Sequence, residues 1–180
     1  MLEYDITFDA NEAEAACSSA RVTVVTQLDR YWGAYDGDGD WSTAKRFMLS
    51  KDDDLYYINS QEIADLGEVD MGNPATLIDF AVWAMTSYPA DRYVLIMSDH
   101  GAGWHGGWSD GDNGNYEGLL MHHIAEALDG ITSRTGVDKL DLVAFDACLM
   151  SQLESLTMIE PYARIAVASE ETIPSIGMAY

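Results

Sequence analysis

The chain has 180 residues, 48% of them hydrophobic, which is enough for one folded domain with a substantial core and too few for two. Its net charge of −22 at pH 7 disfavours nucleic-acid phosphates and anionic lipid as partners. The same charge attracts cationic substrates and calcium, and it is also typical of a protein kept soluble in a salty or extracellular medium. No apolar run approaches the ~20 residues that span a bilayer, and no secretory signal opens the chain.

The hydrophobic pattern predicts helices and strands that alternate along the chain. Asn73 and Pro74 suit the N-cap and the first position of a central helix. Alternation in units of about 40 residues predicts βαβ crossovers and a mainly parallel sheet with helices on both faces. In chain order we expect a helix over 9–20, a strand over 21–28, a turn over 35–41, a hairpin of 45–49 with 54–59, the helix after Asn73, a strand ending before His100, a loop over 101–118, a helix over 119–134, a strand ending before Cys148, a helix over 147–158 and a strand over 164–169.

Two apolar strands each end in a reactive side chain. Residues 93–104 read YVLIMSDHGAGW and residues 140–150 read LDLVAFDACLM, so His100 leaves one strand and Cys148 leaves the next. The carboxyl ends of parallel strands meet at one edge of a sheet, where open α/β sheets place their active sites. We therefore expect His100 and Cys148 to approach each other at that edge.

A thiol beside an imidazole suggests nucleophilic catalysis. A free thiol has a pKa of about 8.5 and is mostly protonated at neutral pH, whereas a nearby imidazole can take its proton and later protonate a leaving amine. Cys148 falls in the first turn of the expected helix over 147–158, whose dipole favours the thiolate. The N–H groups of Gly101 and Cys148 are candidates for an oxyanion hole. The alternative is an inert buried cysteine and a loop histidine beside Asp99.

Six short segments occur in an order that points to a known family. They are VTQLDR (25–30), GEVDMGNPATLIDF (67–80), YPADRY (88–93), DHGAGW (99–104), FDACLM (145–150) and ASEETIP (168–174). Together they resemble the clostripain-like cysteine peptidases, in the clan of caspases, gingipains and legumains, from about Val22 to Tyr180. The resemblance implies a caspase-like three-layer α/β/α sandwich with a mainly parallel sheet. Residues 1–180 would form a single peptidase domain, truncated at both ends, because the family's first strand is expected before residue 1 and further elements after Tyr180.

The resemblance also implies roles for single residues. His100 matches the catalytic histidine, Cys148 the nucleophile and Gly101 the oxyanion position. Asp146 matches an acidic residue implicated in binding a basic P1 side chain, so cleavage would follow Arg or Lys through an acyl-enzyme intermediate. Asp146 also stands where the N-cap of the following helix is expected, and both interpretations stay open.

Glu170 and Glu171, at the end of the next strand, are further candidates for lining the substrate pocket, although such a pair is more often solvated. The segment YDGDGDW (35–41) begins like a calcium loop, but Trp41 and Phe47 stand where an EF-hand has its glycine and its bidentate glutamate. It therefore predicts a turn. No cofactor is assigned, and calcium binding stays open because some family members depend on calcium. The four histidines match no zinc-ligand spacing.

The sequence thus predicts a cysteine endopeptidase acting on peptides or proteins with a basic P1 residue, without nucleic-acid or membrane partners. The alternative is a catalytically inactive relic or peptide-binding domain of the same fold. A small-molecule hydrolase fits less well, since the chain lacks a G-x-S-x-G elbow. The resemblance favours a secreted or cell-surface location. Between His100 and Arg134 there is no Lys or Arg, so we expect no autocleavage within residues 101–133.

Overall fold

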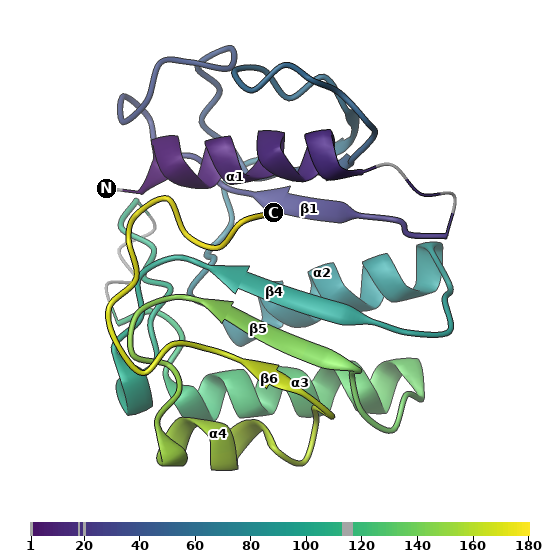
Figure 1. Cartoon of the computed structure of the whole chain (residues 1–180), viewed down its shortest axis with the longest axis vertical. Coiled ribbons are helices and arrows are strands. Elements are labelled where there is room, and N and C mark those ends of the chain that lie inside the picture. Colours follow the sequence, from purple (N-terminus) through teal and green to yellow (C-terminus); the bar gives the residue numbers. More distant parts are fainter. Residues whose placement is uncertain (1, 18, 20, 113–116) are drawn as a thin grey trace. The chain divides into compact units, whose positions relative to one another are not determined.

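The computed structural model describes residues 2–17, 19, 21–112 and 117–180. Residues 18 and 20 of the predicted first helix and residues 113–116 of the predicted glycine-rich loop therefore lie outside the described part. The chain forms two compact units, one of residues 1–69 with 175–180 and the other of residues 70–174. Each unit has its own three-stranded sheet (Figure 1). That residues 1–180 act as a single peptidase domain stays a prediction.

The first unit combines one helix with an antiparallel sheet. Helix α1 spans Glu3–Ala16, and strands β1 (Val25–Leu28), β2 (Lys45–Met48) and β3 (Gln61–Asp65) pair in the order β1-β2-β3. Both pairings are antiparallel, so the expectation of a mainly parallel sheet is wrong for this unit.

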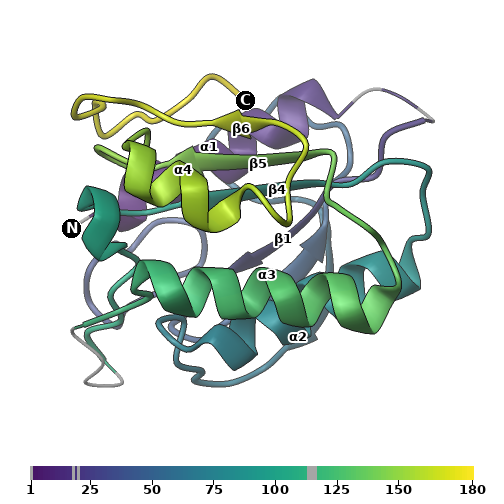
Figure 2. The same cartoon turned by 90° about the horizontal axis from the view of Figure 1, so that it is seen from below.

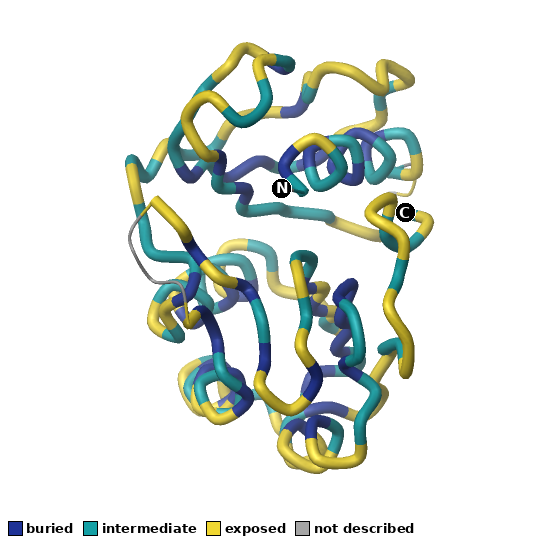
Figure 3. The backbone as a smooth tube through the Cα atoms, turned by 90° about the vertical axis from the view of Figure 1, so that its left-hand side faces the viewer, coloured by how far each residue is buried: buried dark blue, intermediate teal, exposed yellow. Residues whose placement is uncertain are grey.

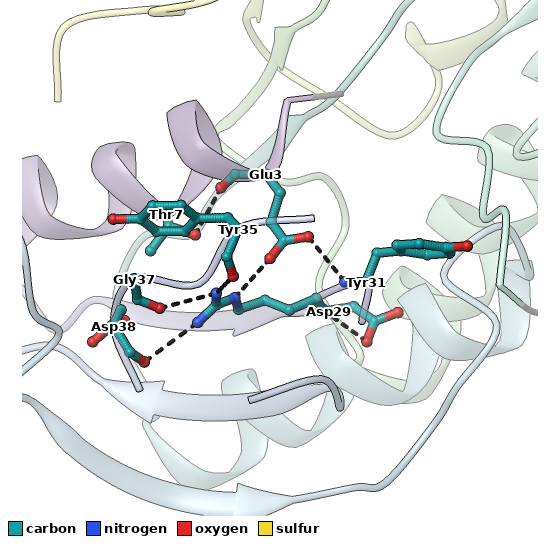
Figure 4. Close-up of polar contacts among 8 residues, drawn as sticks. Glu3, Thr7, Asp29, Tyr31, Tyr35, Gly37 and Asp38 are labelled. Carbon is teal, nitrogen blue, oxygen red and sulfur yellow. Dashed lines mark hydrogen bonds and ion pairs between the residues drawn. The ribbon is translucent and has the colours of Figure 1, made fainter. Parts of the chain in front are cut away.

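A buried arginine organises the first unit (Figure 4). The side chain of Arg30 is 0% exposed, and its Nε donates to Oε1 of Glu3 in α1 at 2.9 Å. Its two terminal nitrogens donate to the carbonyl oxygens of Tyr35 at 2.6 Å, Gly37 at 3.1 Å and Asp38 at 3.3 Å. A buried charge is tolerated when it is paired and its donors are used. Arg30 therefore ties the turn that follows β1 to the start of α1.

Two boundaries in the first unit differ from the sequence-based expectation. The first helix begins at Glu3 rather than at residue 9, and Glu3 and Asp5 supply the acidic first turn that the helix dipole favours. Residues 54–59 are not a strand. Oδ1 of Asp52 accepts from the N–H of Asp54, and Oδ1 of Asp54 accepts from the N–H of Tyr56 at 2.9 Å. Such local bonds compete with a strand ladder, so β2 pairs with β3 instead.

The second unit contains a parallel sheet, as expected. Strands β4 (Val94–Ser98), β5 (Leu142–Asp146) and β6 (Ala166–Val167) pair in parallel in the order β4-β5-β6. Its helices are α2 (Pro74–Ser87), α3 (Met121–Thr135) and α4 (Leu153–Ile159), with a short 3₁₀ helix η1 (Gly103–His105) after β4. The final strand is shorter than the predicted 164–169.

The helices of this unit follow from its connections. Helices α2 and α3 lie side by side on one face of the sheet (Figure 2), and α4 packs against α3. The crossovers β4-α3-β5 and β5-α4-β6 step in the same direction across the sheet, and right-handed crossovers of that kind place their helices on the same face. A helical layer on the opposite face, as in a three-layer sandwich, stays a prediction.

The core of the second unit forms between β5 and α3. Val143 and Phe145 of β5 and Ile124, Leu128 and Ile131 of α3 are completely buried, and Figure 3 marks such positions in dark blue. In β4 the buried residues alternate with exposed ones, as a sheet with one covered face requires. The strand ends that carry the reactive residues are therefore fixed by a packed core.

The central helix of the chain starts as the sequence predicts. The side chain of Asn73 accepts a hydrogen bond from the N–H of Ala75 at 2.9 Å, and Pro74 is the first helical residue. This N-cap prediction is confirmed, because capping chemistry depends only on neighbouring residues.

Candidate functional site

The histidine and the cysteine singled out by the sequence occupy equivalent positions on neighbouring strands. The β4–β5 register ends with Ser98 beside Asp146, and His100 and Cys148 each follow their strand's last paired residue by two positions. The N–H of Asp99 extends the ladder by donating to the carbonyl of Asp146 at 3.2 Å. The structure therefore brings the two residues to one edge of the sheet, as predicted.

Gly101 lies directly against the backbone of Cys148. A Cβ atom on Gly101 would clash with the carbonyl oxygen of Cys148 and would approach its amide nitrogen to 2.9 Å. The backbone there has no room for such a clash to relax. Glycine is consequently required at this position by the closeness of the two loops, independently of any catalytic role.

The main chain of His100 is held in place by hydrogen bonds on both its N–H and its carbonyl. The N–H of His100 donates to Oδ1 of Asp99 at 2.6 Å, and its carbonyl accepts from the N–H of Trp108 at 3.2 Å. The His100 side chain itself is exposed. Burial, and to a smaller extent the neighbouring carboxylate of Asp110, raise the pKa of Asp99. The loop thus fixes the histidine's main chain while leaving its imidazole accessible.

The turn after β5 overturns two expectations. Helix α4 begins at Leu153, not near residue 147, and its N-cap is Gln152 without a side-chain capping bond. Asp146 is therefore not a helix N-cap, and Cys148 does not lie in the first turn of a helix. The physical reason is that Leu149 has φ +65°, outside the helical region, and its N–H donates to the backbone carbonyl of Glu171 at 3.1 Å instead of joining a helix. The dipole of α4 therefore does not favour a thiolate at Cys148, contrary to the expectation from the sequence.

Asp146 and the two glutamates differ in environment. Asp146 is 3% exposed at the end of β5, whereas Glu170 and Glu171 are exposed. A buried carboxylate interacts more strongly with a cation than a solvated one does, because water screens it less. Of the three predicted pocket residues, Asp146 alone combines burial with a position near Cys148. Their role in substrate binding stays a prediction.

Residues 168–174, one of the six segments of the family resemblance, make contacts around Cys148 that the sequence did not predict. The chain after β6 runs antiparallel to the turn after β5. The N–H of Ser151 donates to the carbonyl of Ser169 at 2.9 Å, and the N–H of Leu149 donates to the carbonyl of Glu171. Two residues further on, the N–H of Ile173 lies 3.4 Å from Sγ of Cys148. No local sequence signal marks these contacts, because they join residues about 20 positions apart.

A glutamine links the two loops that carry His100 and Cys148. Oε1 of Gln152, in the turn after β5, accepts from the N–H of Trp104 at 3.2 Å. The same side chain packs on Gly103, where a Cβ would clash with it. The sequence offered no signal for this link either, because Gln152 falls inside the helix predicted over 147–158 and its partner Trp104 lies 48 positions away.

The acidic segment 35–41 forms a turn, as predicted. The N–H of Asp40 donates to the carbonyl of Gly37 at 3.2 Å, and Oδ1 of Asp38 accepts from the N–H of Ile58 at 3.1 Å. Burial raises the pKa of Asp38.

Two of the other histidines also have local partners: His105 lies against the ring of Trp104, and Nδ1 of His123 accepts from the N–H of Leu120 at 3.4 Å.

Comparison with known proteins gives consistent matches. The sequence profile of the clostripain family, peptidase C11, matches residues 3–180. Clostripain of Hathewaya histolytica is 33% identical in a region that covers 63% of this chain and 24% of the relative. The chain therefore spans about a quarter of that relative's length.

Two solved structures share the fold. A secreted C11 cysteine protease from Bacteroides thetaiotaomicron, in complex with an irreversible peptide inhibitor, superimposes with a TM-score of 0.80 at 23% identity, over 99% of this chain and 48% of that chain. An inactive zymogen C11 protease from Parabacteroides distasonis gives 0.67 at 20% identity, over 96% and 44%. Among the described residues, no helix has the length and apolar character needed to cross a bilayer.

Proposed function

Because this chain belongs to the clostripain family, we propose that it carries the catalytic residues of a cysteine endopeptidase, with Cys148 as nucleophile and His100 as its base. The observation that carries the proposal is the equivalent placement of these residues beyond the paired ends of β4 and β5. A nucleophile and its base have to come within hydrogen-bond reach of each other, and open α/β sheets place their active sites at the carboxyl ends of the strands. The backbone contact between Gly101 and Cys148 supports their closeness.

In this mechanism the imidazole of His100 takes the proton of the Cys148 thiol, and the thiolate attacks the substrate carbonyl. The N–H groups of Gly101 and Cys148 stabilise the resulting oxyanion. His100 then protonates the leaving amine as the C–N bond breaks, which leaves a thioester on Cys148. Water, deprotonated by His100, hydrolyses the thioester and releases the acid product and the thiol.

We propose further that substrates are peptides with Arg or Lys at P1, bound by Asp146. Its burial at 3% exposure supports a strong interaction with a guanidinium or ammonium group. Glu170 and Glu171 are exposed and can add only a screened attraction. The net charge of −22 also favours the approach of basic peptides. A structural relative bound to a peptide inhibitor agrees with a peptide substrate.

We propose in addition that the whole protein forms a three-layer caspase-like sandwich and that it has a secreted or cell-surface location. The location is supported by the description of a structural relative as secreted. The alternative of an inactive relic remains a distinct outcome for the experiment below.

An arginyl chloromethylketone tests the proposed pair, because it alkylates a nucleophilic cysteine that recognises arginine. We expect mass spectrometry to find Cys148 modified in the wild type and unmodified in His100→Ala. His105→Ala is the matched control, since this second histidine lies in η1, and it should leave labelling intact. Absence of labelling in the folded wild-type protein would favour the inactive relic.

A further inference from the structure

The family resemblance does not say which groups stabilise the thiolate form of Cys148. A thiolate in a protein needs a nearby positive charge, a helix N-terminus or hydrogen-bond donors. The sequence suggested a helix N-terminus for this purpose, but α4 begins only at Leu153. His100 carries a positive charge once it has taken the thiol proton, and with the helix N-terminus absent a hydrogen-bond donor is the remaining means of stabilising the charged form of Cys148.

Ile173 supplies such a donor. Its backbone N–H lies 3.4 Å from Sγ of Cys148, and its carbonyl oxygen lies 3.9 Å from the same sulfur. The N–H contact suits the thiolate, which accepts hydrogen bonds, and the carbonyl contact suits the protonated thiol, which donates one. The shorter distance belongs to the contact that favours the thiolate.

The position of Ile173 is built into the fold rather than left to a free loop. The two antiparallel hydrogen bonds from Leu149 and Ser151 to Glu171 and Ser169 hold the segment just before it. Those bonds come from the same turn that presents Cys148. The donor and the sulfur are thus fixed relative to each other, which removes much of the ordering cost of forming the contact.

We propose that the backbone N–H of Ile173 is a catalytic hydrogen-bond donor that stabilises the Cys148 thiolate, in the place that a helix N-terminus would otherwise take. The inference rests on the proposed function of Cys148 as a nucleophile. The side chain of Ile173 has no part in it. A hydrogen bond to a charged acceptor is about twice as strong as one to a neutral acceptor, so this donor interacts more strongly with the thiolate than with the thiol.

The test removes the N–H and keeps the side chain. Replacing Ile173 with its α-hydroxy acid turns the amide into an ester, which has no donor but has the same side chain. Ile173→Ala is the matched control, since it changes the side chain and keeps the donor. Both are made in the full chain with Cys17→Ser, so that Cys148 is the remaining thiol. The rate of alkylation by iodoacetamide is measured from pH 5 to pH 10.

We expect the pH at which alkylation reaches half its maximal rate to rise by about one unit in the ester, which corresponds to one charge-assisted hydrogen bond. Ile173→Ala should keep the wild-type midpoint. A midpoint that is unchanged or lower in the ester would overturn the proposal, since the segment would then merely cover the thiol. Ile173→Pro removes the same N–H genetically, and near-UV circular dichroism checks that each variant is folded.

The comparison between the ester and the amide is repeated in a His100→Ala background, so that the imidazole of His100 cannot contribute to the midpoint. The groups on the segments around Cys148 are Asp99, His100, His105, Asp146, Glu170 and Glu171. The ester should raise the midpoint in this background too, because the N–H acts on sulfur directly. Iodoacetamide requires no peptide recognition, so this result is independent of whether the protein cleaves peptides. Failure of the proposed function appears instead in the chloromethylketone experiment.

Discussion

Gln152 accepts a hydrogen bond from the backbone N–H of Trp104 at 3.2 Å, and so joins the turn after β5 to the loop after β4. These two segments carry Cys148 and His100. Gln152→Leu keeps the side chain's approximate size and removes the acceptor, which leaves the position of the His100 loop less defined. We expect kcat/KM to fall about tenfold, mainly through kcat, since about 1.4 kcal/mol corresponds to that factor.

Gln152→Glu is the matched control, because a carboxylate oxygen can accept the same bond from Trp104. It should retain most of the wild-type kcat. Equal losses in the Leu and Glu variants would show that the link to Trp104 has no positioning role. An unchanged thermal midpoint in both variants would separate positioning from general stability.

Asp146→Asn tests the proposed substrate pocket. The substitution keeps the shape and removes the charge of a residue that is 3% exposed. We expect the preference for Arg over Gln at P1 to fall at least a hundredfold, seen mostly in KM, because a buried ion pair with the substrate is lost. Glu170→Gln is the control at an exposed position and should change the preference little. An Asp146→Asn enzyme with undiminished selectivity would assign this residue a structural role only.

Glu14 gives the first unit a pH-dependent stability. It is buried in α1, and its Oε1 accepts from the N–H of Ser60 at 2.8 Å. Burial is the main cause that raises its pKa, and Asp52 adds to it. The folded state therefore holds this proton more tightly than the unfolded state does. The contribution of Glu14 to stability is fully present below the unfolded pKa of about 4.5 and is lost as pH rises through the higher folded pKa.

Glu14→Gln should remove this decline and raise the melting temperature at pH 7 by a few degrees, since the amide oxygen can still accept from Ser60. Glu12→Gln, on the same helix, is the control. Thermal unfolding followed from pH 4 to pH 8 by circular dichroism measures the effect. Parallel curves for wild type and Glu14→Gln would mean that burial of this carboxyl has no net effect.

Arg30→Lys tests the buried ion pair of the first unit. A lysine has one nitrogen in place of three and cannot reach Glu3 and the carbonyls of the following turn together. We expect a loss of about 3 kcal/mol in the free energy of unfolding, because buried carbonyl oxygens lose their donors at about 1–3 kcal/mol each. Arg21→Lys, at an exposed position, should lie within about 0.5 kcal/mol of wild type. Chemical denaturation of both variants measures these changes in the free energy of unfolding.

The parts of the site that the sequence predicted are those fixed by local pattern and by sheet geometry. His100 and Cys148 follow apolar runs, and parallel strands bring such ends together whatever the intervening chain does. Asn73 caps its helix through its own neighbours. Gly101 was predicted only as an oxyanion donor, and its close approach to the backbone of Cys148 was not predicted.

The parts that it did not predict depend on contacts between distant segments. The residues after Cys148 have helical composition, yet Leu149 and Ser151 pair with the chain after β6, and this pairing delays the helix to Leu153. Tertiary hydrogen bonds thus override helix propensity. The same pairing places Ile173 on the thiol, which no pattern in the sequence could indicate.

Hydrolysis of two peptides that differ only at P1, one with Arg and one with Gln, tests Cys148 and His100 as the catalytic pair of a peptidase that recognises arginine. The measurement compares wild type with Cys148→Ala and His100→Ala, all shown to be folded by thermal unfolding. We expect cleavage after Arg by the wild type, little cleavage after Gln, and a loss of at least a thousandfold in kcat/KM in both variants. Cleavage that persists in Cys148→Ala, or a folded wild type that cleaves neither peptide, would contradict this expectation.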